Sequence, residues 1–228
     1  MFRAISIACA AAAMCCAQPA VRPASITAVG SSSISVAPDL ARVDVGVNTQ
    51  AATAQAASQA NATLASAVIM ALQSLLGSSG SIKTVNYSLS PVYSNPSPGQ
   101  PAVIIGFSVN NTVETTLTDL SKIGPTVDTA IQSGANSVQG ISFDLQDRNP
   151  PTAQALKTAA ASAMSQAAAI AAGLNVHTGA VLHASEGVTL VPQVVGVAAP
   201  VAGPVSTPVQ TGLVIIQASV TLEVALAP

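Results

Sequence analysis

The chain has 228 residues and a formal net charge of −2, from 7 basic and 9 acidic side chains. Only 7% of the residues are charged and 2% are aromatic. A nucleic-acid-binding domain needs clustered lysine and arginine, and usually aromatic side chains on which bases stack, so the composition excludes this class. Half of the residues are hydrophobic, mostly alanine and valine, which predicts a core of small side chains with closely approaching backbones.

The N-terminal segment has the pattern of a secretory signal peptide. Arg3 gives it a positive start, residues 4–17 form a short run of small and apolar residues, and Cys15 and Ala17 are small residues at positions −3 and −1 of a cleavage site. A buried helix is the alternative, but the run is too short to span a bilayer and a Pro-rich segment follows it. We therefore predict a signal peptide over residues 1–17 and a periplasmic or secreted protein.

All three cysteines, Cys9, Cys15 and Cys16, lie in this segment. Cleavage near Ala17 would leave a mature chain without cysteine, and therefore without disulfides or thiol redox chemistry. Because Arg3 is removed as well, the mature charge becomes 6 − 9 = −3. Acylation of Cys15 or Cys16 would instead give a lipid-anchored protein, but the small residue usually found before a modified cysteine is missing, so this alternative is less favoured.

The rest of the chain is expected to form one domain. Residues 18–25 are predicted to be a disordered N-terminal segment, and residues 26–228 to be the folded domain. No run of 18 consecutive apolar residues follows the N-terminal segment. We therefore predict no transmembrane span in the mature chain.

The spacing of apolar residues predicts ten elements. Val43, Val45 and Val47 alternate with polar residues as in a half-buried strand, whereas apolar residues after position 51 recur at helical spacing. In chain order we expect strands at 26–36, 40–50, 82–93, 102–117, 138–145, 176–190 and 213–226, and helices at 51–76, 120–133 and 149–172. The order ββα-ββα-βα-ββ predicts an α+β fold, a two-layer sandwich with three helices packed on a largely antiparallel mixed sheet.

Prolines mark three local features. Inside a helix Pro125 would cost about 3 kcal/mol, so the second helix is either kinked there or begins near Pro125 after a separate turn. Asn149 followed by Pro150 is typical of an N-cap and the first helical position. The segment 191–212 is rich in Pro, Gly and Val, and we expect a long loop that contacts a partner or folds back on the domain.

Few residues offer chemistry. His177 and His183 are the only histidines, and on one strand they would lie roughly 20 Å apart, too far for one metal ion. We therefore expect surface histidines. Asp144, Asp147 and Arg148 come at the end of a strand. They could supply an acid/base pair, but a solvated loop with a local ion pair is the favoured interpretation.

Asp39, which follows Pro38, is expected to be a turn residue and not a catalyst. The sequence has no G-x-S-x-G elbow, no H-E-x-x-H and no Gly-rich phosphate loop. We accordingly assign no catalytic, cofactor-binding or metal-binding residues. An unrecognised hydrolase or redox enzyme is the alternative, and it would require Asp144, Asp147 or Glu186 in a cleft with strongly shifted pKa values.

Several short segments occur together in a fixed order. They are Gly30, 36–41 (VAPDLA), 88–93 (SLSPVY), 106–107 (GF), 111–113 (NTV), 134–136 (GAN), 140–143 (GISF), the alanines at 155, 159, 163 and 167, and 218–222 (ASVTL). This ordered set resembles the SIMPL-domain family, of the bacterial periplasmic immunogenic protein type. The chain departs from the family pattern at Pro125 and in its long apolar segment before the last strand.

The resemblance implies an exported, non-catalytic α+β protein that can form ring-like homo-oligomers. It also implies a link to envelope stress, notably oxidative stress, and for related animal proteins a role as signalling partners. It implies no catalytic residues and no cofactor. We therefore expect a protein that acts through its surfaces, as a homo-oligomer or with envelope protein partners. The segment 191–212 or the hairpin near residues 94–99 is expected to contact another subunit.

Overall fold

The computed structural model describes residues 23–77, 79–95, 98, 100–193 and 209–227, and it confirms the α+β class and the order of the elements. The elements are β1 (Ser25–Val36), β2 (Leu40–Ala51), α1 (Ala54–Leu76), β3 (Gly80–Tyr93), β4 (Ile104–Leu117), the 3-10 helix η1 (Leu120–Lys122), α2 (Ile123–Gln132), β5 (Ser137–Asp144), α3 (Asn149–Gly173), β6 (His177–Gln193) and β7 (Leu213–Ala227).

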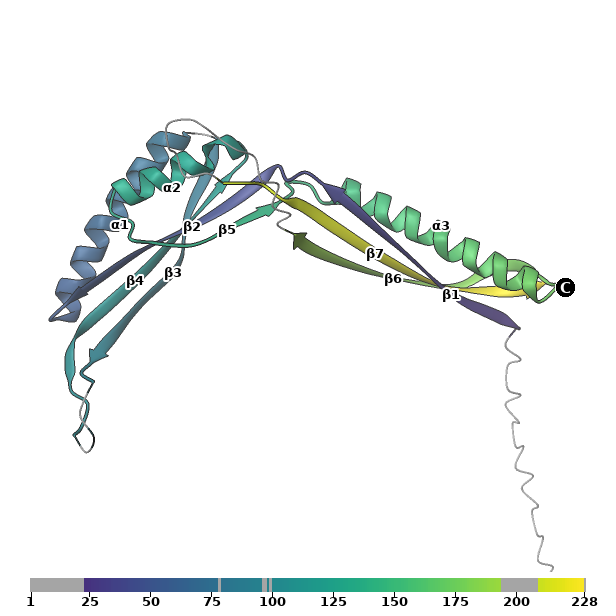
Figure 1. The fold of residues 1–228 in the computed structure, drawn as a ribbon, viewed down its shortest axis with the longest axis horizontal. Helices are drawn as coiled ribbons and strands as arrows, with labels where there is room; N and C mark the ends of the chain where they lie inside the picture. Colours follow the sequence, from purple (N-terminus) through teal and green to yellow (C-terminus); the bar gives the residue numbers. More distant parts are fainter. Residues whose placement is uncertain (1–22, 78, 96–97, 99, 194–208, 228) are drawn as a thin grey trace, which may run out of the picture.

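The strands are divided between two sheets, where one shared sheet was expected. One sheet has the order β3-β4-β2-β5 and carries α1 and α2, and we call this unit the first lobe. The other has the order β1-β7-β6 and carries α3, and we call it the second lobe. All pairings are antiparallel. Figure 1 shows the lobes end to end as an arch, with the helices outside and the open sheet faces inside.

The core of the first lobe follows the predicted alternation. Val43, Val45 and Val47 of β2 are fully buried beneath the helices. α1 begins at Ala54, with the Thr53 side chain accepting a hydrogen bond from the Ala56 N–H at 3.2 Å. Within the described residues, α1 is the one helix that is long and apolar enough to cross a membrane by length and composition. One face of α1 packs on the sheet, as in a core helix.

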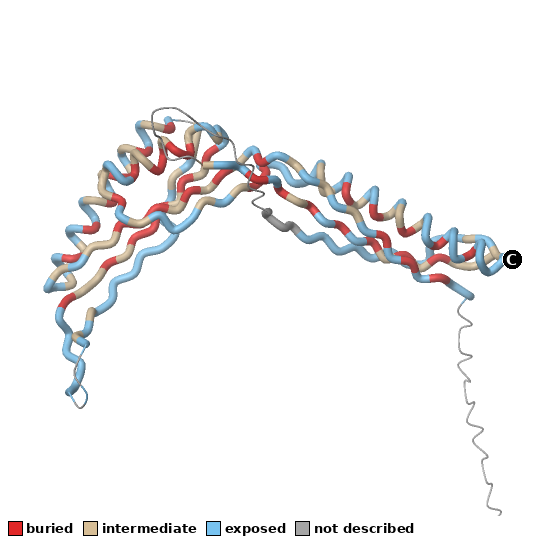
Figure 2. The backbone as a smooth tube through the Cα atoms, in the orientation of Figure 1, coloured by how far each residue is buried: buried red, intermediate tan, exposed pale blue. Residues whose placement is uncertain are grey.

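In the core of the second lobe, the buried residues of the helix are all alanines, and they pack on larger strand residues such as Ile216 and Leu222. The buried face of α3 consists of one alanine every four residues, at Ala155, Ala159, Ala163, Ala167 and Ala171. A Cβ at Gly30 of β1 would lie only 2.1 Å from the Ala159 carbonyl oxygen. The predicted core of small side chains is therefore realised here, and Figure 2 shows buried residues recurring along α3, β1 and β7. Ile170 and Leu174, at the end of α3, are exposed because the buried face of the helix is limited to this row of alanines.

Pro125 lies in the first turn of α2, because α2 begins at Ile123. A proline in the first turn removes no intrahelical hydrogen bond, so the helix does not kink. The separate turn before it is η1, in which the Asp119 carboxylate accepts a hydrogen bond from the Ser121 N–H at 3.1 Å. The second of the two predicted alternatives is therefore correct.

The predicted signal peptide at 1–17 and residues 18–22 lie outside the described residues, as does the central part of the predicted loop, 194–208. β1 begins at Ser25 and the Ala24 carbonyl accepts a hydrogen bond from Leu226 N–H at 2.8 Å, so the end of the segment 18–25 is paired. At the other side of the loop, Val209 packs against the core of the first lobe. The described end of this connection therefore lies against the first lobe.

Candidate functional site

A buried carboxylate lies where the two lobes join. Asp144, the last residue of β5, is 6% exposed. Its Oδ1 accepts hydrogen bonds from Arg148 Nε and from the Leu145 N–H, both at 2.8 Å. Its Oδ2 is 3.1 Å from Arg42 Nη1 and also accepts a hydrogen bond from Arg148 Nη2. The predicted ion pair is therefore present. The predicted solvated loop is wrong for Asp144, because Arg42 of β2, far away in sequence, closes over it.

The electrostatics of Asp144 indicate a structural role. Burial would by itself raise the pKa of its carboxyl, but hydrogen bonds from Arg148, the Leu145 N–H and Arg42 outweigh burial, so its pKa lies below the ordinary value. The same contact raises the pKa of Arg148. A carboxylate held ionised by four donors is a poor proton acceptor, so Asp144 does not have the properties of a general base.

Asp39 strengthens the same junction. Its Oδ1 accepts a hydrogen bond from the Gln146 N–H at 2.7 Å, and its own N–H donates to the Asp144 carbonyl at 3.2 Å. Asp39 lies in the connection from β1 to β2, and Gln146 in the connection from β5 to α3. Both connections run from one lobe to the other, so these hydrogen bonds hold the two connecting segments together at the junction. Asp39 was expected to be a turn residue, but the structure assigns no turn at residues 37–39, and its carboxylate binds a distant segment.

Asp147 does not join Asp144. Its carboxylate accepts a hydrogen bond from the Asn149 N–H at 2.8 Å, at the start of α3. The N-cap position of α3 falls on Arg148, one residue before the predicted Asn149. Pro150 and Pro151 both lie in the first turn of the helix. Asp147 therefore serves the helix end, and no acid/base pair forms with Asp144.

A second pair of carboxylates, which the sequence did not indicate, lies on the open face of the first lobe. Asp44 of β2 is directly opposite Glu114 of β4. Burial and the negative charge of Glu114 raise the pKa of Asp44, while Glu114 forms an ion pair with Lys83 at 2.8 Å. Only the strand register could have identified this pair, because the two residues are 70 positions apart.

An uncharged row of asparagines crosses the same open face. Asn110 Nδ2 donates to Asn48 Oδ1 at 2.5 Å, and Asn86 Nδ2 donates to Asn110 Oδ1 at 3.3 Å. Asn136 bonds to the backbone of Asn48 in both directions, at 2.8 and 2.7 Å. These amides satisfy one another across four chain segments, so this row requires no ligand.

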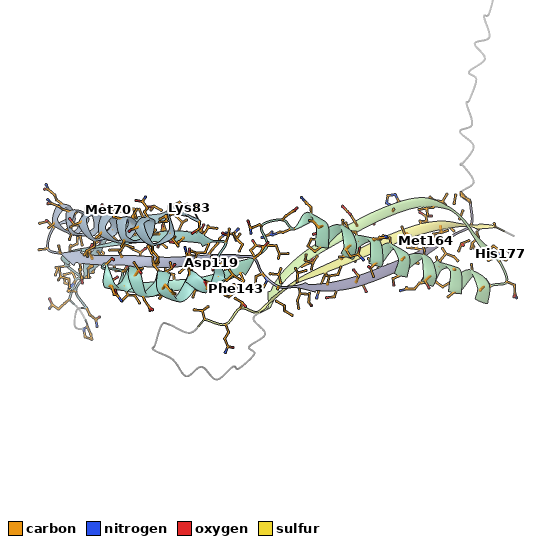
Figure 3. All side chains as sticks on the ribbon, turned by 90° about the horizontal axis from the view of Figure 1, so that it is seen from above. Met70, Lys83, Asp119, Phe143, Met164 and His177 are labelled. Carbon is orange, nitrogen blue, oxygen red and sulfur yellow. The ribbon has the colours of Figure 1, made fainter. Side chains whose placement is uncertain are left out.

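The remaining candidates stay apart. His177 and His183 are both exposed on β6, and no group of three or more potential metal ligands occurs in the described part of the chain. Figure 3 shows His177 at the end of the second lobe, far from Asp119 and Lys83 of the first. Glu186 is exposed in the middle of β6. The cleft required by the hydrolase alternative is therefore not formed by Asp144, Asp147 and Glu186.

A hollow of about 460 Å³ on the open face of the second lobe has no such chemistry either. It is lined by small and uncharged residues, among them Ser31, Ser33, Thr189 and Ser219. None of these hydroxyls has a histidine or carboxylate among the other lining residues, so no activated nucleophile is present in it.

Exposed apolar side chains gather instead on the β3–β4 hairpin. We call them the hairpin patch: Val85, Tyr87, Leu89, Tyr93, Val103, Ile104 and Ile105. The alternation of apolar residues along 102–117 predicts that Val103 and Ile105 face inward, whereas the structure exposes both. Tyr93, Val103, Ile104 and Ile105 are bare because β2 ends at Ala51, opposite Phe107, so the hairpin continues beyond both β2 and α1 (Figure 1). Val85, Tyr87 and Leu89 lie on β3, the outer strand of the sheet, where Tyr87 still donates a hydrogen bond to Ser58 of α1 at 3.2 Å. No charged residue occurs between Lys83 and Glu114.

These features define a two-lobed α+β protein that has a buried ion cluster at its junction and apolar strands on its surface. The model of the SIMPL family, described as a protein of unknown function (DUF541), matches residues 26–224, and the chain belongs to this family. The resemblance found in the sequence is thereby confirmed.

Two relatives carry the same name. The chain is 28% identical over 174 residues to the 26 kDa periplasmic immunogenic protein of Brucella melitensis, covering 74% of this chain and 69% of that protein. The protein of that name from Brucella abortus (strain S19) matches with the same identity and coverage.

Similarity to solved structures is weaker. Crystal structures of AtUAH in complex with glyoxylate and with (S)-hydroxyglycine have TM-scores of 0.29 and 0.28 and identities of 16% and 14%. They cover 58% and 60% of this chain, and this chain spans about a third of theirs, 34% in each case. These values carry no inference about function.

Proposed function

We propose that this protein is an exported protein of the bacterial periplasm that acts by contact, through self-assembly or through binding other envelope proteins, and not by catalysis. Two relatives named as periplasmic proteins support the compartment, as does the signal-like segment with Arg3 and residues 4–17. The observation that carries the contact function is the hairpin patch.

The hairpin patch is apolar on both faces. Val103, Ile104 and Ile105 are consecutive and are 56%, 53% and 61% exposed, and successive residues of a strand point to opposite faces. The seven side chains present on the order of 600 Å² of apolar surface, against about 800 Å² per partner in a standard interface. A two-stranded hairpin is only marginally stable alone in water, so a partner that covers it would stabilise it.

The two tyrosines of the chain, Tyr87 and Tyr93, are both in this patch. Tyrosine is enriched in interface cores, while charged residues are depleted there, and the 30 residues 84–113 carry no charge. A second copy presents the same uncharged surface, so two patches can meet without like-charge repulsion. This supports self-assembly as the first form of contact.

Multi-angle light scattering of the mature, secreted protein tests the proposal. We expect an oligomer, and we expect Ile105→Ser to lower its mass, because Ile105 loses apolar contact area. Met70→Ser on α1 is the matched control, since Met70 is 63% exposed and lies outside the patch. A wild-type monomer at all concentrations, with no bound envelope protein, would overturn the proposal.

Anchoring and physiology are further parts of the proposal. Mass spectrometry of the mature N-terminus separates cleavage after Ala17 from acylation of Cys15 or Cys16. The family resemblance supports a role in envelope or oxidative stress, and we expect a deletion strain to be more sensitive to peroxide than its parent. Unchanged sensitivity would argue against that role.

A further inference from the structure

β6 is an edge strand that is bare on both faces. Among the described residues, the sheet order β1-β7-β6 leaves its outer side without a neighbouring strand, and each residue from Gly179 to Thr189 is exposed. α3 packs mainly on β1 and β7 and contacts β6 much less. α3 thus lies over the β1–β7 half of the sheet and not over its β6 edge, as would be expected if the sheet continued beyond β6.

The outer edge of β6 lacks the usual protection against strand pairing. Natural edge strands are short, bulged, or carry lysine or proline, because their free N–H and C=O groups can pair with another chain. β6 has 17 residues. Its register with β7 shifts only between Thr178 and His183 and is regular from His183 to Gln193. Glu186 is its single charged residue, and Pro192 comes only at its end.

We propose that β6 pairs antiparallel with β6 of a second copy, so that two three-stranded sheets become one six-stranded sheet. The proposal rests on the self-assembly proposed above and names a contact different from the hairpin patch. A strand that pairs with its own copy forms an isologous contact around a two-fold axis.

A two-fold axis at Gly187 gives the favoured register. It places Ser185 opposite Thr189 on the open face, and Glu186 opposite Val188 on the α3 side. Ser and Thr opposite each other can form hydrogen bonds, and cross-strand like charges are avoided. An axis at Glu186 would place two carboxylates opposite each other, so it is disfavoured. Because β6 carries a single charge, it can pair with its own copy in a register that places no like charges opposite each other.

A second copy also covers the apolar side chains of β6. Val181 and Val188 are exposed on the α3 side of the sheet, in the part that the helix does not cover. In the paired form with the axis at Gly187, Val188 of each copy lies diagonally across the axis from Val188 of the other copy, between the two α3 helices. An extended segment from another protein could use the same backbone edge, and the experiment separates this from self-pairing.

Two oppositely charged double variants test the pairing. Ser185→Lys with Thr189→Lys places like charges across the axis, and so does Ser185→Glu with Thr189→Glu. Each alone should show a two-fold lower particle mass than the wild type by light scattering, and a 1:1 mixture should restore the wild-type mass. Both variants act whether the axis lies at residue 185, 187 or 189, so the test does not depend on one register.

The matched control is Thr27→Lys with Ser31→Lys, on the open face of the opposite edge strand β1. It makes the same charge change on the same sheet and should keep the wild-type mass. Circular dichroism must show that every variant is folded. Because the mature chain has no cysteine, Gly187→Cys should form an intermolecular disulfide on oxidation, whereas Ser31→Cys should not.

The outcomes are distinct. If the wild type assembles and both charged variants keep its mass, the β6 contact is wrong while self-assembly stands. A mixture that stays at the lower mass, or variants that lose only another envelope protein, would also overturn β6 self-pairing. If the wild type is monomeric at all concentrations, the self-assembly part of the proposed function fails as well.

Discussion

The two lobes solve the same packing problem with side chains of different size. In the first lobe, valines and leucines such as Val68 and Leu72 fill the space between α1, α2 and a four-stranded sheet. In the second, alanines let α3 approach so closely that Gly30 has no room for a side chain. Large side chains on a helix can cover the strands on either side of it, whereas a row of alanines covers only the strands directly beneath the helix. The comparison explains why β6, the third strand beneath α3, is left bare.

The largest expected effect is on the close approach itself. Gly30→Val places a Cβ within 2.1 Å of the Ala159 oxygen and 2.3 Å of the Ala163 nitrogen, which are backbone atoms that cannot rotate away. We expect a loss of about 3 kcal/mol or more in unfolding free energy. Hydrogen exchange should show lost protection in β1, β7 and α3 with β2 to β5 still protected.

Gly140→Ala is the control for this prediction. Gly140 lies on β5 of the first lobe, and a Cβ added there meets nothing within 4 Å. It should change the unfolding free energy by less than about 0.5 kcal/mol. Equal effects of the two substitutions would contradict the difference between the lobes.

A smaller effect is expected at the junction. Asp144→Asn leaves Arg42 and Arg148 without their carboxylate, and since both guanidinium groups are partly exposed we expect a cost of about 1–2 kcal/mol. Because the pKa of Asp144 is lowered by folding, its contribution is present above the unfolded-state pKa and is lost as pH falls through the folded-state pKa.

Urea unfolding at pH 7 and at successively lower pH tests this sign. The difference between wild type and Asp144→Asn should be largest at pH 7 and should shrink with acidification. Asp147→Asn, three residues further along the chain and just before α3, is the comparison variant and should not remove the ion cluster. A difference that grows toward low pH would contradict the assignment.

The smallest effect is a gain. Asp44→Asn removes a carboxylate that lies opposite Glu114, and we expect about 0.5 kcal/mol of added stability at pH 7. The raised pKa of Asp44 means that its favourable protonated form is lost as pH rises through the folded-state pKa. The gain should therefore disappear in acid. A loss of stability at pH 7 would show that Asp44 interacts more with Arg42 than with Glu114.

Local periodicity predicted the elements but not their partners. The alternation at Val43, Val45 and Val47 was predicted correctly because it depends only on neighbours in sequence. The division into two sheets was not predicted, because alternation does not say which strands pair. The burial of Asp144 depends on Arg42, 102 residues away. The exposure of the hairpin patch depends on where β2 and α1 end in space, which its own alternation does not contain.

The strand order of the second lobe has a consequence for how the chain matures. β7, residues 213–227, is the central strand between β1 and β6, while the first lobe is a continuous stretch from β2 to β5, inserted between β1 and α3. During synthesis or translocation, all strands of the first lobe are therefore available before the second lobe is complete. The second lobe cannot form its sheet before its central strand β7 is available. β6 therefore has no strand partner on either edge until the fifteen residues of β7 have been made or translocated.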